Sequence, residues 1–350
     1  MSEAAVTFDA VNIVFGDRPE TALPMMDQGQ SRGDIQSATG QVLGVHDCSL
    51  SVETGEILVL MGLSGSGKST LLRAVNGLNP VCRGEVKVRH GGDLVSVTHA
   101  DAATLRQLRL STIGMVFQQF GLLPWRSVRE NVGLGLELGG MAKDKRTAKV
   151  DEQLALVGLS DWAERKVGDL SGGMQQRVGL ARAFATDAPI LLMDEPFSAL
   201  DPLIRTRLQD ELLDLQQKLN RTIVFVSHDL DEAFKLGNRI AIMEGGRIVQ
   251  HGTPRDIFQN PASPYVADFV AHMNPLGVLT AQDVMGPSQT ETTRTTAVDT
   301  PIGDILPLFN GDASPISVIE LGHELGQITQ ASVVARLAAA RESYGVQRKT

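Results

Sequence analysis

The residues that most clearly indicate a chemical function lie between Gly62 and Ser69, in the run Gly-Leu-Ser-Gly-Ser-Gly-Lys-Ser. This run matches the phosphate-binding pattern Gly-x-x-x-x-Gly-Lys-[Ser/Thr] at every fixed position. Glycines allow the backbone to curl around phosphate oxygens and to point successive N–H groups at them. The pattern predicts that Lys68 reaches the β- and γ-phosphates and that Ser69 holds Mg²⁺. The predicted nucleotide contacts in this stretch are Gly62, Ser64, Gly65, Ser66, Gly67, Lys68, Ser69 and Thr70.

The sequence on either side of this loop favours the same interpretation. Residues 57–61 form an apolar run that is typical of a buried parallel strand. Residues 70–76 contain neither Pro nor Gly and predict a helix, whose N-terminus favours phosphate through its partial positive charge. The alternative is a flexible Gly/Ser-rich turn. It is less favoured because a chance match is rare in a chain of this length, and the flanking elements make it rarer still.

Five further signals follow the loop in a fixed order. Singly, each has an ordinary explanation. A Ser-Gly-Gly can be a loop, an Asp-Glu after a strand can cap a helix, and a His after a strand is more often structural. Their order and context together are specific. The signals are Gln118, Leu-Ser-Gly-Gly-Met-Gln-Gln-Arg at 170–177, Asp194-Glu195, Ser-Ala-Leu-Asp at 198–201, and His228.

The elements that would position these residues alternate between strands and helices. Because strands that are apolar throughout are typical of sheets covered by helices, we expect an α/β fold with a parallel or mixed sheet. The polar segment 17–44 is predicted to be an insertion with one short helix. Strands are predicted at 6–15, 45–52, 57–61, 84–88, 113–117, 190–193, 222–227, 239–243 and 247–250, and helices at 101–109, 202–219 and across 127–168.

Composition excludes several classes of protein. The chain has 350 residues and a formal charge of -9, which disfavours sequence-independent nucleic-acid binding, so no nucleic-acid partner is expected. Cys48 and Cys82 fit no metal-ligand or Cys-x-x-Cys pattern. No run of 18 apolar residues and no signal-peptide pattern occurs. We therefore expect a cytosolic chain that reaches a membrane only through a partner.

Together these motifs resemble the ATP-binding subunits of ABC transporters over about residues 6–273. The resemblance implies a P-loop ATPase core, a mixed sheet with an inserted α-helical subdomain, that binds ATP and Mg²⁺. In such a core Ser69, Gln118 and Asp194 would hold the metal, Asp194 through water, and Gln118 would also contact ATP. Glu195 would polarise the attacking water and His228 would contact the γ-phosphate, so these two are the predicted catalytic residues.

The resemblance also implies an aromatic contact to adenine and, separately, ATP contacts made in trans. Phe15, in place of the commoner Tyr, would stack on adenine. Asp201 would belong to the D-loop, and Met174 stands where the signature usually has Gln. Two copies facing head to tail would enclose two ATP molecules, closing on ATP and opening after hydrolysis. The predicted contacts to the ATP of the other copy are Ser171, Gly172, Gly173 and Gln175.

Within this family, the chain is most similar to the branch that imports glycine betaine, proline betaine and choline. The features are the insertion at 20–43, the loop at 61–67, and the runs 199–206 and 223–233. The branch implies a homodimeric, peripheral ATPase on the cytoplasmic face of the inner membrane, working with a permease and a periplasmic binding protein. The substrate never touches this subunit, so choline and glycine betaine both stay open.

Two further segments carry predictions. The apolar residues of 118–127 predict a groove for a short permease helix, although packing on the helical subdomain (about 120–170) is an equal alternative for some of them.

The domains are predicted at 1–275 and 276–350. The second has the order strand, helix, strand, strand, helix at 294–298, 302–309, 316–320, 325–329 and 331–341, and resembles a single CBS domain. Pairing between two copies and a degenerate remnant are the alternatives for it.

Two rival classes share part or all of this pattern. A small-molecule P-loop kinase would share Gly62–Ser69 and could use Asp194, but it would need neither 170–176 nor 198–201. A soluble ABC-type ATPase acting on ribosomes or DNA would share every motif. It would normally have two ATPase cores or a long coiled coil, and neither occurs in this sequence.

Overall fold

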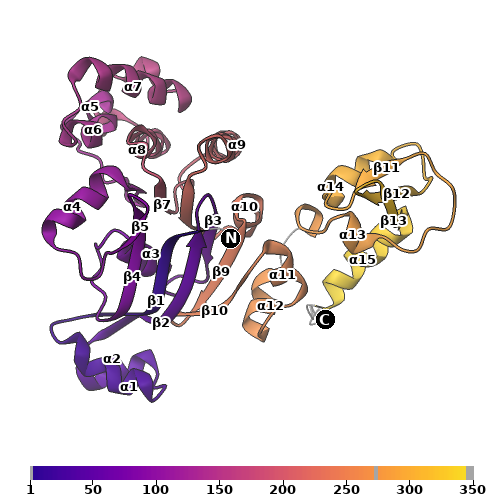
Figure 1. Ribbon diagram of the computed structural model, residues 1–350, viewed down its shortest axis with the longest axis horizontal. Helices are drawn as coiled ribbons and strands as arrows, with labels where there is room; N and C mark the ends of the chain where they lie inside the picture. The colour runs from indigo at the N-terminus through magenta and orange to yellow at the C-terminus, as the bar shows by residue number, and fades with distance from the viewer. Residues whose placement is uncertain (1–2, 272–274, 344–350) are drawn as a thin grey trace. The chain divides into compact units, whose positions relative to one another are not determined.

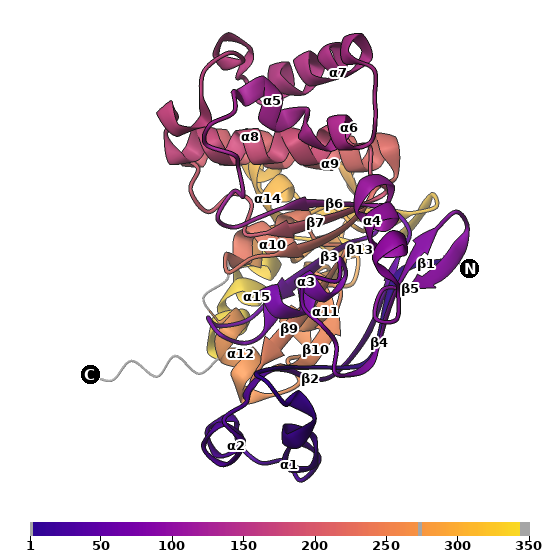
Figure 2. The ribbon, with the colours of Figure 1, turned by 90° about the vertical axis from the view of Figure 1, so that its left-hand side faces the viewer.

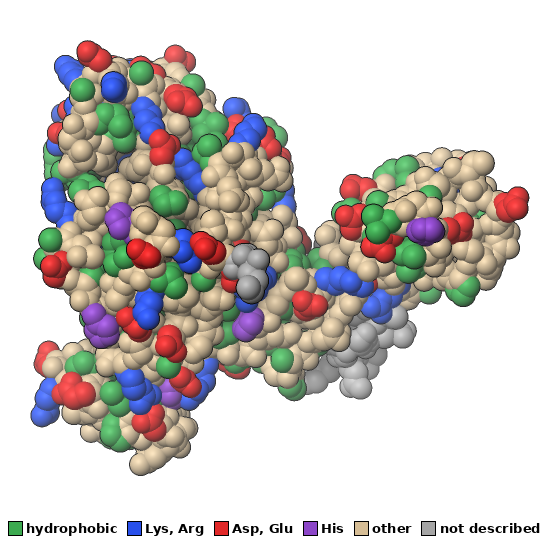
Figure 3. Space-filling view, in the orientation of Figure 1, with side chains coloured by type: hydrophobic (Ala, Val, Ile, Leu, Met, Phe, Trp, Pro, Cys, Tyr) green, Lys and Arg blue, Asp and Glu red, His purple; other side chains and the backbone are tan. Residues whose placement is uncertain are grey.

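A computed structural model describes residues 3–271 and 275–343 of the chain, with side chains to residue 337. The described residues form two compact units. Unit 1 holds residues 3–228 and 241–249, and unit 2 holds residues 229–240, 250–271 and 275–343. No helix in these described ranges is long and apolar enough to cross a bilayer. Figure 3 shows Lys and Arg side chains interspersed with Asp and Glu over the face that it presents.

Unit 1 contains two sheets where the sequence suggested one. The first has four antiparallel strands in the order β2-β1-β4-β5. Their bounds are β1 Ala4–Phe15, β2 Val42–Glu53, β4 Arg83–His90 and β5 Asp93–Ser96. The short strand β5 was not predicted, because its four residues lie at the edge of the sheet and bury little apolar surface.

The second sheet carries the predicted chemistry. Its order is β10-β9-β3-β8-β7-β6, and β3, β8, β7 and β6 pair in parallel. Every residue of β3, β7 and β8 is buried, as their continuous apolar runs predict. The bounds are β3 Ile57–Met61, β6 Ile113–Val116, β7 Ile190–Asp194, β8 Thr222–Val226, β9 Arg239–Glu244 and β10 Arg247–Gly252.

Helices cover these sheets and build a subdomain. Helix α3 contributes Leu71, Leu72 and Ala74 to a core that also contains side chains of both sheets. The predicted helical subdomain is present: α5, α6 and α7 pack on α8 at one end of unit 1 (Figures 1 and 2). The helices are α3 Lys68–Ala74, α4 Ala102–Ser111, α5 Val128–Val132, α6 Leu134–Leu138, α7 Lys143–Leu156, α8 Gly172–Ala185 and α9 Pro202–Leu219, with 3₁₀ turns at Ser160–Trp162 and Val167–Asp169.

The insertion after β1 is more ordered than predicted. It forms a 3₁₀ turn (Pro19–Ala22) and two helices, α1 (Leu23–Asp27) and α2 (Arg32–Thr39), so the prediction of one short helix was wrong. Ser31 caps α2 and Gly40, at φ +71°, ends it. The two helices bury Met26 and Ile35 in a small core that also contains Val14 of β1 and Leu43 of β2. They lie at the opposite end of unit 1 from α5, α6 and α7 (Figure 2).

Unit 2 ends in the predicted order of strand, helix, strand, strand, helix. The sheet order is β11-β12-β13, with β11 parallel and β13 antiparallel to β12. Leu321 and Gly322, both at positive φ, form the turn of the β12–β13 hairpin. This turn lies one residue before the predicted one. The elements are α10 Leu230–Leu236, α11 Pro254–Gln259, α12 Pro264–Val270, α13 Ala281–Val284, β11 Thr295–Ala297, α14 Ile302–Ile305, β12 Ile316–Glu320, β13 His323–Ile328 and α15 Gln330–Ser343, with 3₁₀ turns at Pro275–Gly277 and Leu306–Phe309.

Candidate functional site

The predicted phosphate loop connects β3 to α3. Its glycines are required by geometry: Gly62 has φ +139°, and a Cβ there would lie 2.2 Å from the carbonyl oxygen of Met243. Gly67 has φ +103°, and its Cβ would lie 2.7 Å from the carbonyl oxygen of Gly44. Side chains at these positions would therefore displace the backbone that supports the loop.

Lys68 begins α3 and folds back over the loop. Its Nζ donates to the carbonyl oxygens of Gly62 at 2.8 Å and Leu63 at 3.0 Å. Burial lowers the pKa of the Lys68 ammonium, while Glu195 and Asp194 act in the opposite direction. Lys68 is thus a largely buried cation held at the loop, where it can neutralise a phosphate.

Asp194 ends β7 and is fully buried beneath α3. Its Oδ1 accepts a 2.6 Å hydrogen bond from Ser69 Oγ, and its Oδ2 accepts a 2.8 Å charge-assisted bond from Arg73. Sequence reasoning missed Arg73. The one signal was its position four residues after Ser69, which places both side chains on the same face of α3.

Glu195 follows Asp194 in a left-handed conformation, at φ +49°. Its Oε2 lies 3.2 Å from Gln118 Nε2 and 3.4 Å from His228 Nδ1. Its backbone N–H donates to the carbonyl oxygen of Val226 on β8. The ends of the neighbouring strands β6, β7 and β8 therefore bring together Gln118, Glu195 and His228, as the sequence predicts.

These groups open into one cleft of about 650 Å³, a size typical of nucleotide and cofactor sites. Phe15, from the end of β1, lines the cleft with 39% of its surface exposed. Ser64, Gly65, Gly67, Lys68, Ser69, Thr70, Gln118, Glu195 and His228 line it too. The lining does not include Gly62, Ser66 and Asp194. The hydroxyl of Ser66 is buried and has no hydrogen-bond partner in the described part of the chain.

The predicted trans contacts lie away from this cleft, at the start of α8. Ser171 is the N-cap, with Gly172 and Gly173 in the first turn, and Gln175 donates to the carbonyl oxygen of Leu170. The lining of the cleft contains none of these residues. Asp201 caps α9 and accepts from the Ile204 N–H at 3.0 Å.

Gln176 is a second residue that sequence reasoning missed. It is 2% exposed, and its Nε2 donates to the carbonyl oxygen of Glu195 while its Oε1 accepts from the N–H of Ala199. It therefore ties the helix that begins at Ser171 to the strand end that carries Glu195. The available signal was a polar side chain in the interior of a helix, three residues after the Gly-Gly pair.

The donor set beside the phosphate loop suits Mg²⁺. Ser69, Asp194 and Gln118 offer hydroxyl, carboxylate and amide oxygens, and Mg²⁺ prefers hard oxygen ligands with one or two carboxylates plus substrate phosphates. Among the described residues there is no cluster of three His, Cys, Asp or Glu side chains that would form an all-protein metal site. A metal here would accordingly depend on phosphate oxygens for part of its shell.

A second hollow lies between the sheet and the helical subdomain. It measures about 320 Å³, and its lining includes Phe117, Gly121, Leu134 and Leu138. Arg182 holds its rim by donating to the carbonyl oxygens of Phe120 and Gly121. Of the segment 118–127, Gly121 lines this groove and the five apolar side chains do not. Trp125, one of these five side chains, is 69% exposed.

Comparison with known proteins gives a consistent result. The family model described as ABC transporter matches residues 45–198. The glycine betaine/proline betaine transport ATP-binding protein ProV of Salmonella typhimurium is 45% identical over 340 residues, covering 96% of this chain and 84% of the relative. The Bacillus subtilis glycine betaine transport ATP-binding protein OpuAA is 47% identical over 285 residues, covering 81% and 67%. The trimethylamine N-oxide transport ATP-binding protein TmoW of Ruegeria pomeroyi is 45% identical over 281 residues, covering 79% and 81%.

Solved structures agree with these relatives. A dimeric bacterial ABC transporter cassette superposes with a TM-score of 0.62 at 30% identity, covering 71% of this chain and 99% of that one. The same cassette in a post-hydrolysis state, bound to ADP and phosphate, gives a TM-score of 0.61 at 31% identity.

Proposed function

The chain belongs to the ATP-binding subunits of ABC transporters, and from that premise we propose that it hydrolyses ATP to power import of a quaternary amine. The relatives named for glycine betaine, proline betaine and carnitine transport support this class, as ProV, OpuAA and GbuA of Listeria monocytogenes do. The observation that carries the proposal is the convergence of Lys68, Glu195 and His228 on one cleft. Glycine betaine and choline are the substrates to test.

The chemistry proposed for this cleft is phosphoryl transfer to water, in which positioning and charge neutralisation dominate. Phe15 stacks on adenine, while the loop amides and Lys68 hold the phosphates. The Glu195 carboxylate accepts a hydrogen bond from the attacking water and orients it toward the γ-phosphate. His228, 3.4 Å from Glu195, donates a hydrogen bond to the γ-phosphate, and Gln118 steadies the same carboxylate.

Ser69, Asp194 and Gln118 would hold Mg²⁺, which when bound supplies neutralisation of phosphate charge. The residues fit this role because Ser69 and Gln118 line the cleft and Ser69 already donates to Asp194 at 2.6 Å. Arg73 fixes the orientation of the Asp194 carboxylate through a charge-assisted bond.

The active form is proposed to be a homodimer. Ser171, Gly172, Gly173 and Gln175 lie outside the cleft of their own chain, which suits contacts to the ATP of the second copy. The dimeric cassette that this chain resembles supports that arrangement. Asp201 then belongs to the interface, and Gln176 connects the trans contacts to Glu195 within each copy.

The dimer is proposed to sit on the cytoplasmic face of the inner membrane, bound to a permease that a periplasmic binding protein supplies with substrate. The groove at Phe117, Gly121 and Leu134 is proposed to receive a short helix of that permease, since it is apolar and borders Gln118. The names of the relatives, each a subunit of a transport system, support a permease partner.

The proposed domains are a nucleotide-binding domain at 1–275 and a CBS-like regulatory domain at 276–350. The match to ProV spans 340 residues and thus includes much of the C-terminal segment. The segment has a hydrophobic core with Ile302, Ile316 and Val333. Beside it lies a hollow of about 480 Å³ next to the 64% exposed Val334, which favours pairing with the same segment of a second copy.

Transport by the assembled complex tests this function. The chain would be reconstituted in lipid vesicles with the permease and binding protein encoded beside it, and ATP-dependent uptake of labelled glycine betaine and choline would be measured. We expect uptake of at least one, and none with Lys68→Ala. If the parent chain hydrolysed ATP but never co-purified with a permease, a soluble ABC-type role would replace this proposal.

A further inference from the structure

The insertion after β1 reaches the phosphate loop through one side chain, Arg32. Its Nη1 donates to the carbonyl oxygen of Gly65 at 2.7 Å, and its Nη2 donates to the carbonyl oxygen of Gly44 at 2.8 Å. Arg32 is the first residue of α2, and Gln36 follows one turn later on the same face. Both side chains line the cleft that holds Lys68. The insertion therefore forms one wall of this cleft.

The charge of Arg32 is uncompensated within the described part of the chain. No ion pair of Arg32 with Asp or Glu occurs there, and its Nε is buried without a hydrogen-bond partner. Burial lowers the pKa of this guanidinium, with no acidic group acting in the other direction. A half-buried cation bonded only to backbone carbonyls is incomplete, because desolvated charge is normally paired. An anion in the cleft would complete it.

Arg32 also supports the loop from behind. The carbonyl oxygen of Gly65 accepts from Arg32, and the next carbonyl oxygen, that of Ser66, accepts from the N–H of Gly246. A Cβ at Gly246 would lie 2.6 Å from Arg32 Nη2, so the guanidinium packs directly on this turn. Fixing these two consecutive carbonyls fixes the peptide planes between Gly65 and Gly67, and with them the course of the loop backbone.

We propose that Arg32 is a nucleotide-binding and loop-positioning residue whose ligand is the phosphate chain of the bound nucleotide. The inference rests on the proposed ATPase function and adds the insertion to its ATP site. The Nη hydrogens that do not bond to Gly65 and Gly44 supply donors for phosphate oxygens, and the guanidinium supplies the counter-charge. The insertion thus contributes to nucleotide affinity through Arg32, independently of the proposed stacking of Phe15 on adenine.

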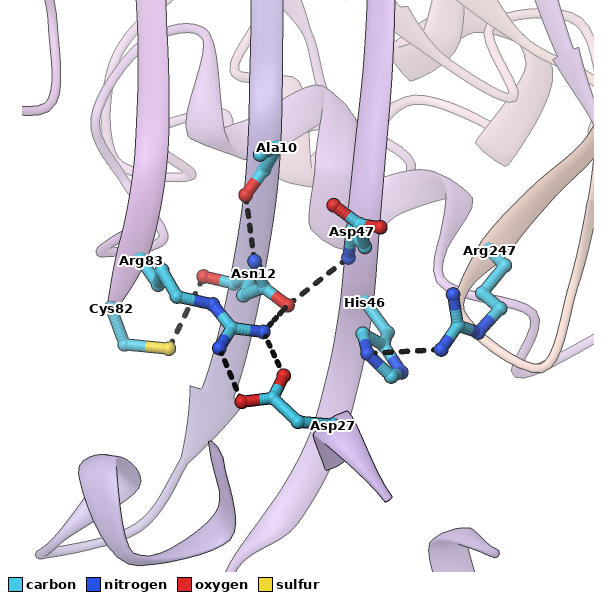
Figure 4. Close-up of polar contacts among 8 residues, drawn as sticks. All are labelled: Ala10, Asn12, Asp27, His46, Asp47, Cys82, Arg83 and Arg247. Atoms are coloured by element: carbon cyan, nitrogen blue, oxygen red, sulfur yellow. Dashed lines mark hydrogen bonds and ion pairs between the residues drawn. The ribbon is translucent and has the colours of Figure 1, made fainter. Parts of the chain in front are cut away.

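The chain offers a matched control in Arg83, which anchors the same insertion without reaching the cleft. Its guanidinium forms a two-point contact with Asp27 of α1, at 2.8 Å and 2.9 Å, and also bonds to Asn12 (Figure 4). Arg83 does not line the cleft. Loss of Arg83 therefore loosens the insertion and leaves the charge beside the loop in place.

Titration calorimetry of the full chain with ATP and with ADP tests the proposal. Arg32→Met keeps the apolar stem and removes the charge and donors, so we expect affinity for both nucleotides to fall about 10- to 100-fold. Arg32→Lys should regain part of this loss because it keeps the charge. Arg83→Ala should bind as the parent does.

Three results would overturn the inference. Parent affinity in Arg32→Met would remove Arg32 from the site. A loss in Arg83→Ala equal to that in Arg32→Met would assign the effect to folding of the insertion. Equal losses in Arg32→Lys and Arg32→Met would show that charge is not the reason. Lys68→Ala separates these outcomes from failure of the proposed function, since a parent chain that binds ATP no better than Lys68→Ala would refute that function itself.

Discussion

The side-chain amide of Gln118 lies 3.2 Å from Oε2 of Glu195, a residue 77 positions further along the chain. Gln118 directly follows Phe117, which lines the groove proposed for a permease helix. One hydrogen bond thus connects the edge of that groove to the carboxylate proposed to orient water. Movement of the loop at Gln118 would alter the position of Glu195 and link docking to hydrolysis.

Glu195→Gln should retain ATP binding and lose hydrolysis. The amide keeps the size of the side chain and cannot accept a proton or align water as a carboxylate does, so we expect turnover to fall at least about 100-fold. ATP should then hold two copies together, which light scattering with ATP and Mg²⁺ would detect as a dimer. Turnover within a few-fold of the parent would remove Glu195 from the catalytic role.

Trp125→Glu should weaken assembly with the permease. The indole is 69% exposed on the segment that follows Gln118, and a charge there would have to be desolvated at an interface. Trp162→Glu is the matched control, because Trp162 is the other tryptophan of the chain and is 40% exposed in the same helical region. Co-purification with the permease and uptake in vesicles should fall for the first variant only. Intact assembly of Trp125→Glu would show that the indole of Trp125 is not part of the permease contact.

Removal of residues 276–350 should change dimer affinity and the response of ATPase activity to salt and nucleotides. Phe258, which precedes the cut, packs in the same core as Ile302 and Ile316, so the truncated chain exposes apolar surface. A full-length variant, Val334→Glu, avoids that problem by placing a charge at the exposed hollow. Leu321→Glu, at the 95% exposed hairpin turn, is its control. Unchanged dimer affinity and ATPase response in both the truncated chain and Val334→Glu would show that the segment is a remnant.

The free energy of unfolding should fall at alkaline pH because the thiol of Cys48 is buried. Burial raises the pKa of its thiol to about 11 from 9.0, so the folded chain keeps a proton that the unfolded chain releases. The stabilising contribution is complete below pH 9 and is lost as pH rises toward 11, a decrease of about 2–3 kcal/mol in the free energy of unfolding. Urea unfolding of the parent and of Cys48→Ala at about pH 8.5, 9.5 and 10.5 tests this. The free energy of unfolding of the parent should fall relative to that of Cys48→Ala as the pH rises. A constant difference across that range would contradict it.

Local patterns predicted the part of the cleft that depends on contiguous residues. The strands β3, β7 and β8 were found because a strand buried on both faces must be apolar throughout. Arg73 could not be assigned to Asp194 from sequence, since the two lie 121 positions apart and no local spacing records the pairing. The contact between Arg32 and Gly65 was missed for the same reason. Only one of the two helices of the insertion was predicted, because each is too short to show a period.

The order of strands has a consequence for how the chain is made. The hydrogen bond from the N–H of Gly55 to Oγ1 of Thr222 joins residues 167 positions apart, and β3 pairs with β8 directly after this contact. At ordinary synthesis rates of about 5–20 residues per second, β8 leaves the ribosome roughly 10–30 s after β3. The wholly apolar segment Ile57–Met61 is without that neighbour for this interval. Nascent chains that stop before β8 should therefore be the ones that aggregate or occupy chaperones.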